Sequence, residues 1–208
     1  MNDLLESIKN LRNSEVKNKV DFKINEFATF KNKPIDDIFK ELCFCIMTAN
    51  CSAEKCIEIH ESINDGFIRS NSEALTKKFK ELGYRFPNIR SEYIIEARNY
   101  KTDLKNLFES DIEENKLRDF IVTNIKGLGY KEASHFLRNV GFKNYAIVDF
   151  HIVDLLVKHN LIEKPKSMTK KKYLEIEEIL KTIAERLKLN LAELDLYLWY
   201  LETGKILK

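Results

Sequence analysis

The fold of this chain is decided by residues 126–141, which read KGLGYKEASHFLRNVG. Apolar residues recur at helical spacing before and after the turn made by Gly127, Leu128 and Gly129. Gly141 has the position of a glycine that ends a helix. Because glycine carries no side chain, the backbone N–H groups of this turn can approach an anion closely. The stretch therefore predicts a helix-hairpin-helix motif with a candidate anion site at its turn.

An amine and a carboxylate accompany the turn. Lys131 stands two positions after Gly129, in the first turn of the second predicted helix, and Asp149 follows eighteen positions later, just ahead of a helical pattern over 150–158. Lysine is a nucleophile only as a neutral amine, and both a helix N-terminus and an apolar pocket disfavour its charge. An isolated lysine is usually a solvated surface residue, and an isolated aspartate before a helix is usually an N-cap. With the hairpin, however, the two predict a catalytic pair.

This joint pattern resembles the core of the helix-hairpin-helix DNA glycosylase superfamily, and most closely its archaeal-type 8-oxoguanine DNA glycosylase/AP lyases. The similarity extends from CFCIMTAN, residues 43–50, to LYLWYLETGKILK, residues 196–208. The resemblance implies an all-α, two-lobed helical bundle with the helix-hairpin-helix motif, the HhH-GPD glycosylase fold. Residues 1–208 would form one glycosylase unit, in which roughly 30–110 make one lobe and the N-terminal segment plus 111–208 make the other.

The composition is that of an ordinary soluble protein. The 35 Lys and Arg residues nearly balance the 33 Asp and Glu residues, so a nucleic-acid surface must be a local patch. No apolar run reaches membrane-spanning length, and the first residues, MNDLLESIKNLRN, lack the apolar core of a signal peptide. We therefore expect an intracellular protein that does not act on membranes. The resemblance implies a monomeric, cytoplasmic, prokaryotic-type protein that acts on double-stranded DNA containing a damaged base.

The four cysteines, Cys43, Cys45, Cys51 and Cys56, match no standard zinc spacing. A cytosolic protein keeps such thiols reduced, so buried free cysteines are expected. Relatives of the endonuclease III type carry an iron-sulfur cluster after the catalytic segment, but no cysteine follows Cys56 here. The resemblance therefore implies no iron-sulfur cluster and no metal ligands, and allows a structural monovalent cation at the hairpin.

Local signals predict the remaining helices. Pro34 marks the start of a helix over 35–48, and Ser52 is a candidate N-cap for the next one, which Asp65-Gly66 is expected to end. The other predicted helices span 3–12, about 14–30, 71 or 72 to 82, 89–100, 103–109, 112–124, about twenty residues after a lysine-rich run at 166–172, and 191–202.

The resemblance assigns chemistry to the amine and the carboxylate. A glycosylase extrudes the damaged base from the stack, and positive charge develops on the sugar as the base leaves. Lys131 would attack C1′ and form a Schiff base, which leads to strand cleavage on the 3′ side by β-elimination. Asp149 would stabilise the positive charge at the sugar or help to deprotonate the amine.

The resemblance also implies residues that hold DNA. Backbone amides of Gly127, Leu128 and Gly129 would bind a phosphate. His151 resembles the family histidine that contacts the DNA backbone, although an ordinary histidine is the alternative. Asn50 matches the asparagine that fills the gap opposite the orphaned cytosine, and its alternative is a helix C-cap.

Four further residues are candidates for the base pocket. Trp199 and Phe86 would cover the two faces of the extruded purine, which needs aromatic partners once it leaves the stack, and a core position is the alternative for each. Lys208 resembles the terminal lysine with which archaeal-type relatives recognise the base, whereas disorder is the usual state of a terminus. His135 lies one helical turn after Lys131 and would line the same pocket.

The chain departs from the superfamily in one place, because Ala146-Ile147-Val148 replaces the Gly/Pro-rich element that gives the superfamily part of its name. The pattern as a whole predicts a bifunctional 8-oxoguanine DNA glycosylase/AP lyase. A glycosylase/lyase for oxidised pyrimidines with the same lysine chemistry is one alternative, and a non-catalytic helix-hairpin-helix module that only binds DNA is another. Such a module needs the glycines but neither Lys131 nor Asp149, and this pair therefore favours an enzyme.

Overall fold

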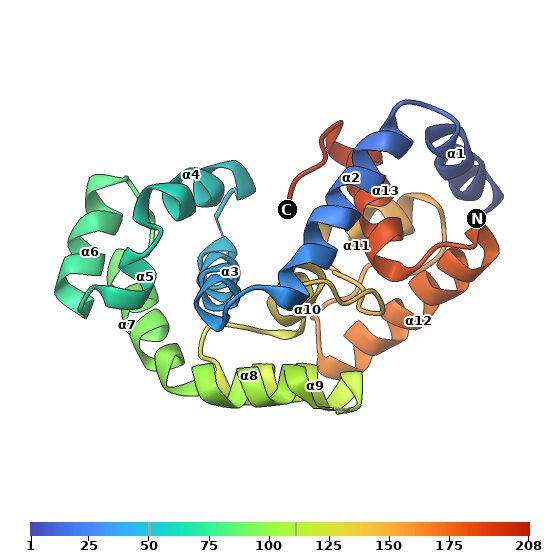
Figure 1. Cartoon of the computed structure of the whole chain (residues 1–208). Helices are drawn as coiled ribbons and strands as arrows, with labels where there is room; N and C mark the ends of the chain where they lie inside the picture. Colours follow the sequence, from blue (N-terminus) through green and yellow to red (C-terminus); the bar gives the residue numbers. More distant parts are fainter. Residues whose placement is uncertain (50, 111) are drawn as a thin grey trace. The chain divides into compact units, whose positions relative to one another are not determined.

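The computed structural model describes residues 1–49, 51–110 and 112–208, and the regular structure of these residues is entirely helical (Figure 1). The all-α fold class is thus confirmed. The helices are α1 (Asn2–Arg12), α2 (Val16–Thr29), η1 (Phe30–Asn32), α3 (Ile35–Thr48), α4 (Ala53–Ile63), α5 (Gly66–Arg69), α6 (Ser72–Glu81), α7 (Pro87–Ala97), η2 (Arg98–Tyr100), α8 (Lys101–Glu109), α9 (Glu114–Asn124), α10 (Tyr130–Asn139), α11 (Phe150–Lys158), α12 (Lys170–Leu187) and α13 (Leu191–Thr203). Within the described residues, no helix is both long and apolar enough to span a membrane.

The chain divides into two compact units. One consists of Met1–Thr29 with Leu137–Lys208, and the other is Phe30–Phe136, so the boundary falls within α10. Residues 112–136 belong to the second unit in this division, whereas the sequence prediction grouped them with the C-terminal lobe. The hairpin after α9 contacts α7 of the same unit, where Lys126 forms an ion pair of 2.9 Å with Glu96.

Helix α3 is the core element of the Phe30–Phe136 unit. It begins directly after Pro34 and ends at Thr48, as predicted. Its last eight residues, 41–48, are all buried, and it packs against α4, α5, α7 and α8. A helix that is apolar on most faces can only be buried, so the neighbouring helices surround it.

Helix α13 has the corresponding place in the other unit, where it contacts α1, α2, α11 and α12. Asn190 and Glu193 form a capping box at its start, which satisfies two orphan backbone donors. Asp195 then reaches α10, and its carboxylate accepts a hydrogen bond of 2.8 Å from Arg138 Nη1. The Arg138 guanidinium also lies 4.7 Å from the Phe27 ring centre.

The end of α4 differs from its prediction. The helix ends at Ile63, and Asn64 takes a positive φ of 43° as its C-cap. Gly66 does not end this helix but begins the short helix α5. Asparagine tolerates a positive φ better than most residues, so Asn64 can end the helix before the glycine.

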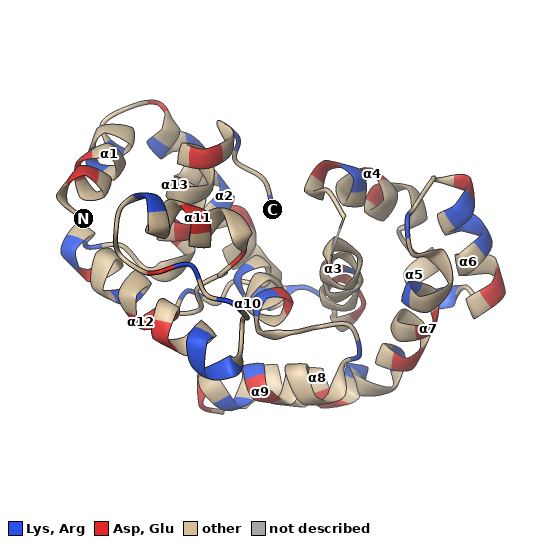
Figure 2. Ribbon diagram, turned by 180° about the vertical axis from the view of Figure 1, so that it is seen from behind, with Lys and Arg blue, Asp and Glu red and all other residues tan. Residues whose placement is uncertain are grey.

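Charged residues of both signs are spread over most helices (Figure 2). One continuous basic stretch is visible at the beginning of α12, where Lys170, Lys171 and Lys172 follow each other.

We expect Asp195→Ala to lower the free energy of unfolding by about 3 kcal/mol or more, because Arg138 would lose its carboxylate partner in the protein interior. The Arg138 and Asp195 side chains are only 4% and 11% exposed. Asp154→Ala is the matched control, since its ion pair with Lys164 lies at the surface, and we expect a loss below about 1 kcal/mol. Urea denaturation followed by circular dichroism measures the free energy of unfolding of both variants. Equal losses would show that the Arg138–Asp195 pair contributes no more than a surface pair.

Candidate functional site

The predicted hairpin lies between α9 and α10. Gly127 adopts a positive φ of 84°, and a Cβ atom there would stand 2.6 Å from Tyr93 Cδ2 and 2.8 Å from Arg90 Nη1. Both the backbone conformation and this close approach require glycine. The Leu128 side chain is buried, and its N–H donates to the Ile125 carbonyl at 3.3 Å. The turn is therefore pinned against α7.

Gly129 caps α10 without needing a positive φ. Its carbonyl accepts the first helical hydrogen bond, from Ala133 N–H at 2.9 Å, and its own N–H donates to Glu132 Oε2 at 3.2 Å. The Glu132 carboxylate thus occupies the amide that the sequence suggested for an anion, as in half of a capping box. A DNA phosphate at this amide would have to displace Glu132, so the anion site stays a prediction.

Lys131 is the second residue of α10, in the predicted first turn. Its side chain is 28% exposed, and Nζ lies 3.7 Å from Glu132 Oε1. Burial raises the pKa of the nearby Cys56 thiol, and a hydrogen bond with Cys51 raises it further, whereas the charges of Lys131 and Arg90 lower it. The amine is therefore accessible on one side and stands near a buried, neutral thiol.

All four cysteines are free thiols. Cys43, Cys45 and Cys56 are buried, as predicted, whereas Cys51 is partly exposed.

Asp149 is the N-cap of α11. Its Oδ1 accepts a hydrogen bond of 2.9 Å from Ile152 N–H, and its backbone is extended, with φ −99° and ψ −176°. The cap fixes one carboxylate oxygen against the helix and also directs the carboxylate to the positive end of the helix dipole. Asp149 can be both an N-cap and a catalytic carboxylate, because Oδ2 has no part in this hydrogen bond.

The segment of residues 146–148, which leads to Asp149, is held by side chains of α12. Glu177 Oε2 accepts from Ala146 N–H at 2.9 Å, and the Tyr173 hydroxyl accepts from Val148 N–H at 3.2 Å and donates to the Ala146 carbonyl at 2.6 Å. Sequence reasoning missed Tyr173 and Glu177. The sequence signal that could have found Glu177 is its place on the apolar stripe of α12, among Ile176, Leu180 and Ile183, where a charged residue is unusual.

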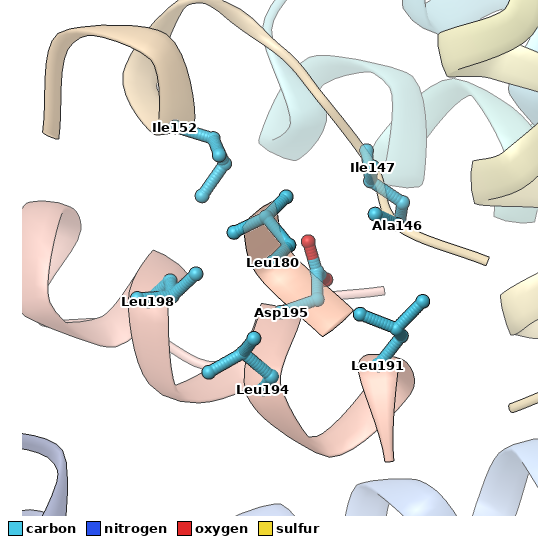
Figure 3. Close-up of a pocket in the computed structure, with 8 residues that line it drawn as sticks. All are labelled: Ala146, Ile147, Ile152, Leu180, Leu191, Leu194, Asp195 and Leu198. Carbon is cyan, nitrogen blue, oxygen red and sulfur yellow. The ribbon is translucent and has the colours of Figure 1, made fainter. Parts of the chain in front are cut away.

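A small hollow lies beneath this segment (Figure 3). Asp195 is the single charged residue of the eight that line it, which are Ala146, Ile147, Ile152, Leu180, Leu191, Leu194, Asp195 and Leu198. An apolar hollow of this kind has few polar groups to bind a ligand, so it belongs to the packing of α11, α12 and α13 and not to the site.

His151 and Trp199 lie together in the same unit. Their ring centres are 5.0 Å apart, with the rings nearly perpendicular at 89°, and both side chains are partly exposed. Phe150 adds a third ring, 3.9 Å from that of His151. The contact joins the predicted backbone-binding histidine to the predicted base-stacking tryptophan.

The remaining candidates have different surroundings. His135 is 8% exposed and meets the Phe44 ring edge-on at 5.8 Å, so it packs into the core of its unit. Phe86 is partly exposed just ahead of α7, with the Arg85 guanidinium 5.0 Å from its ring centre. Lys208 is partly exposed. Asn50 lies outside the described residues. The roles of all four stay predictions.

The profile of the family described as 8-oxoguanine DNA glycosylase matches residues 20–189. The chain belongs to this family. An 8-oxoguanine DNA glycosylase/AP lyase of Methanocaldococcus jannaschii is 52% identical over 206 residues, which cover 99% of each chain. A relative of the same name in Korarchaeum cryptofilum is 48% identical over 100% of this chain and 99% of its own.

The structural match supports the same membership. The crystal structure of the Methanocaldococcus jannaschii 8-oxoguanine glycosylase/lyase in complex with a 15mer DNA containing 8-oxoguanine superimposes with a TM-score of 0.95, at 52% identity and with 99% of each chain covered. This agreement over the full length confirms the helix-hairpin-helix glycosylase fold that the sequence predicted.

Two substitutions separate the cap from the chemistry at Asp149. We expect Asp149→Asn to keep the N-cap, with a free energy of unfolding within about 0.5 kcal/mol of wild type. Asp149→Ala should lower the free energy of unfolding by about 1 kcal/mol. Both should lose most base excision, because both lack the carboxylate charge. Denaturation and single-turnover excision measure the two effects, and full activity in Asp149→Asn would reduce Asp149 to a helix cap.

Proposed function

We propose that this protein removes 8-oxoguanine from double-stranded DNA and then cleaves the resulting abasic strand. Family membership over the full chain supports this function, since the relatives are named as 8-oxoguanine DNA glycosylase/AP lyases. The observation that carries it for this chain is the pair of helix starts, with Lys131 in the first turn of α10 and Asp149 as the N-cap of α11. Double-stranded DNA with a damaged base is the partner.

The reaction begins with the extruded nucleotide and the neutral amine. As Lys131 Nζ bonds to C1′, the bond from C1′ to N9 of the base breaks, and the base leaves with a proton. The sugar ring then opens to a Schiff base between Lys131 and C1′. Loss of a proton from C2′ breaks the C3′–O bond, which cleaves the strand on the 3′ side, and water finally releases the lysine.

Asp149 acts on charge in this sequence. Positive charge develops on the sugar as the base leaves, and a carboxylate fixed by its cap is preorganised to stabilise it. The free oxygen of Asp149 can also accept the proton that Lys131 must lose before it attacks. Because the cap bond uses Oδ1 alone, one carboxylate can serve the helix and the reaction together.

The other residues bind and read the DNA. Trp199 and Phe86 stack on the two faces of the extruded base, Lys208 contacts its edge, and His135 lines the pocket. His151 and the amides of Gly127, Leu128 and Gly129 hold the backbone, with a monovalent cation as the bridge at the hairpin. Asn50 fills the gap that the extruded base leaves opposite the orphaned cytosine. No iron-sulfur cluster takes part, and the enzyme works as a monomer in the prokaryotic cytoplasm.

A glycosylase/lyase for oxidised pyrimidines and a pure binding module are the alternatives. Borohydride reduces a Schiff base to a stable cross-link and therefore separates all three. We expect wild-type protein to be trapped on duplexes that carry 8-oxoguanine or an abasic site and not on undamaged guanine. Trapping on thymine glycol in place of 8-oxoguanine would identify a glycosylase/lyase for oxidised pyrimidines. No trapping on any duplex would favour the binding module.

We expect Lys131→Gln to lose trapping on every duplex, because it removes the only amine assigned to the attack. The matched control is Lys78→Gln, which removes an exposed lysine from α6, and it should be trapped like wild type. Strand cleavage by Lys131→Gln at the wild-type rate would show that another group is the nucleophile.

Removal of Lys208 should weaken excision of 8-oxoguanine at least about tenfold while cleavage of a preformed abasic site changes less than about twofold. The abasic site has no base to recognise, so only the first reaction depends on contacts to the base. Single-turnover rates on the two duplexes measure the difference. Equal losses on both would assign Lys208 to DNA binding or to the fold.

A further inference from the structure

The segment that enters Asp149 is buried but has no regular secondary structure. Ala146, Ile147 and Val148 are 2%, 7% and 3% exposed. They include no proline, which would fix the backbone φ by itself. Buried backbone N–H and C=O groups need hydrogen-bond partners, and a segment outside a helix or a sheet has no regular backbone neighbour that supplies them. Side chains from elsewhere must therefore supply them.

Tyr173 and Glu177 supply these partners. The residues are four positions apart on α12, hence on one face of the helix, and both are 2% exposed. The Tyr173 hydroxyl bridges the two ends of the segment, since it donates to the Ala146 carbonyl and accepts from the Val148 N–H. Glu177 accepts from the Ala146 N–H. Three backbone groups just before Asp149 are thus fixed by two buried side chains.

A carboxylate inside a protein is costly unless it is hydrogen-bonded, so Glu177 at this place points to a task beyond packing. The Tyr173 hydroxyl accepts from the N–H of the Ile147–Val148 peptide, which immediately precedes the peptide that enters Asp149. Its orientation therefore sets where the Asp149 carboxylate stands at the start of α11. Small displacements of a catalytic group are expensive, since about 1 Å can cost about a hundredfold in rate.

We propose that Tyr173 and Glu177 are positioning residues that hold the Asp149 carboxylate in its reactive place. This inference rests on the proposed reaction. It assigns to α12, which carries none of the predicted site residues, a direct influence on the chemistry.

The test uses Tyr173→Phe, which removes the hydroxyl and keeps the ring. Tyr197→Phe is the matched control because Tyr197 is also 2% exposed and lies in the same unit. We expect Tyr173→Phe to lower the single-turnover rate at least about tenfold, with the affinity for a duplex that carries a stable abasic-site analogue within about twofold of wild type. Tyr197→Phe should react like wild type. Equal rates for the two variants would overturn the proposal.

Glu177 gives a second measurement that separates positioning from folding. Glu177→Gln keeps an oxygen acceptor for the Ala146 N–H, so it should retain most of the rate, whereas Glu177→Leu should lose it. Equal rates in the two variants would overturn this role. If wild-type protein does not excise 8-oxoguanine, the proposed substrate is wrong, but cleavage of a preformed abasic site still tests the inference, because it also proceeds through the lysine Schiff base.

An independent observation concerns Phe150, the first residue of α11. Its side chain is 69% exposed although it stands between Asp149 and His151. The rings of Phe150, His151 and Trp199 follow one another at 3.9 Å and 5.0 Å between centres, from the exposed surface inward. An exposed aromatic ring that continues a row of binding residues is a stacking platform for a base or a sugar.

We infer that the Phe150 ring packs on the DNA nucleotide next to the extruded one. Phe22→Ala is the matched control, because Phe22 is 71% exposed in the same unit and belongs to no proposed contact. Phe150→Ala should weaken binding to a duplex with an abasic-site analogue about tenfold, and Phe150→Trp should restore it. Fluorescence anisotropy measures binding without excision, and unchanged affinity in Phe150→Ala would overturn the inference.

Discussion

The absence of a side chain at Gly127 is the constraint on which the rest of the site depends. A Cβ atom there would collide with Tyr93 and Arg90, so the turn can lie against α7 only as glycine. This contact fixes where α10 begins, and α10 carries Lys131 one residue after its start. A bulkier turn would move the amine together with the helix. The hairpin therefore sets the position of Lys131, the proposed nucleophile, independently of any anion that it binds.

The carboxylate is located by a different physical means. Asp149 stands at the end of a buried segment, and its position follows from the cap of α11 and from the hydrogen bonds that Tyr173 and Glu177 accept from N–H groups of the segment. Ala146, Ile147 and Val148 include no proline, which would fix φ by its own ring. In this chain the restraint comes from side chains of a distant helix.

Local signals made much of the fold predictable. Pro34 and Asp149 mark helix starts through their own backbone and side-chain chemistry, and α3 and α11 begin directly after them. The hydrogen bonds from residues 146–148 to α12 could not be predicted, because they join residues 25 to 31 positions apart that only tertiary packing brings together. The bond from the Gly129 N–H to Glu132 was missed although its spacing of three residues is a local capping signal. A sequence motif was enough to predict the class of reaction. The contacts that position Asp149 could be seen only in the structure.

The central claim is that one amine, on Lys131, forms the covalent link to the DNA sugar. Mass spectrometry of the peptides from a borohydride-trapped complex tests it most directly, because it locates the linked residue in the wild-type protein without any substitution. The account predicts that the sugar remnant is attached to the peptide that contains Lys131. Attachment to another lysine or to the N-terminal amine would contradict it.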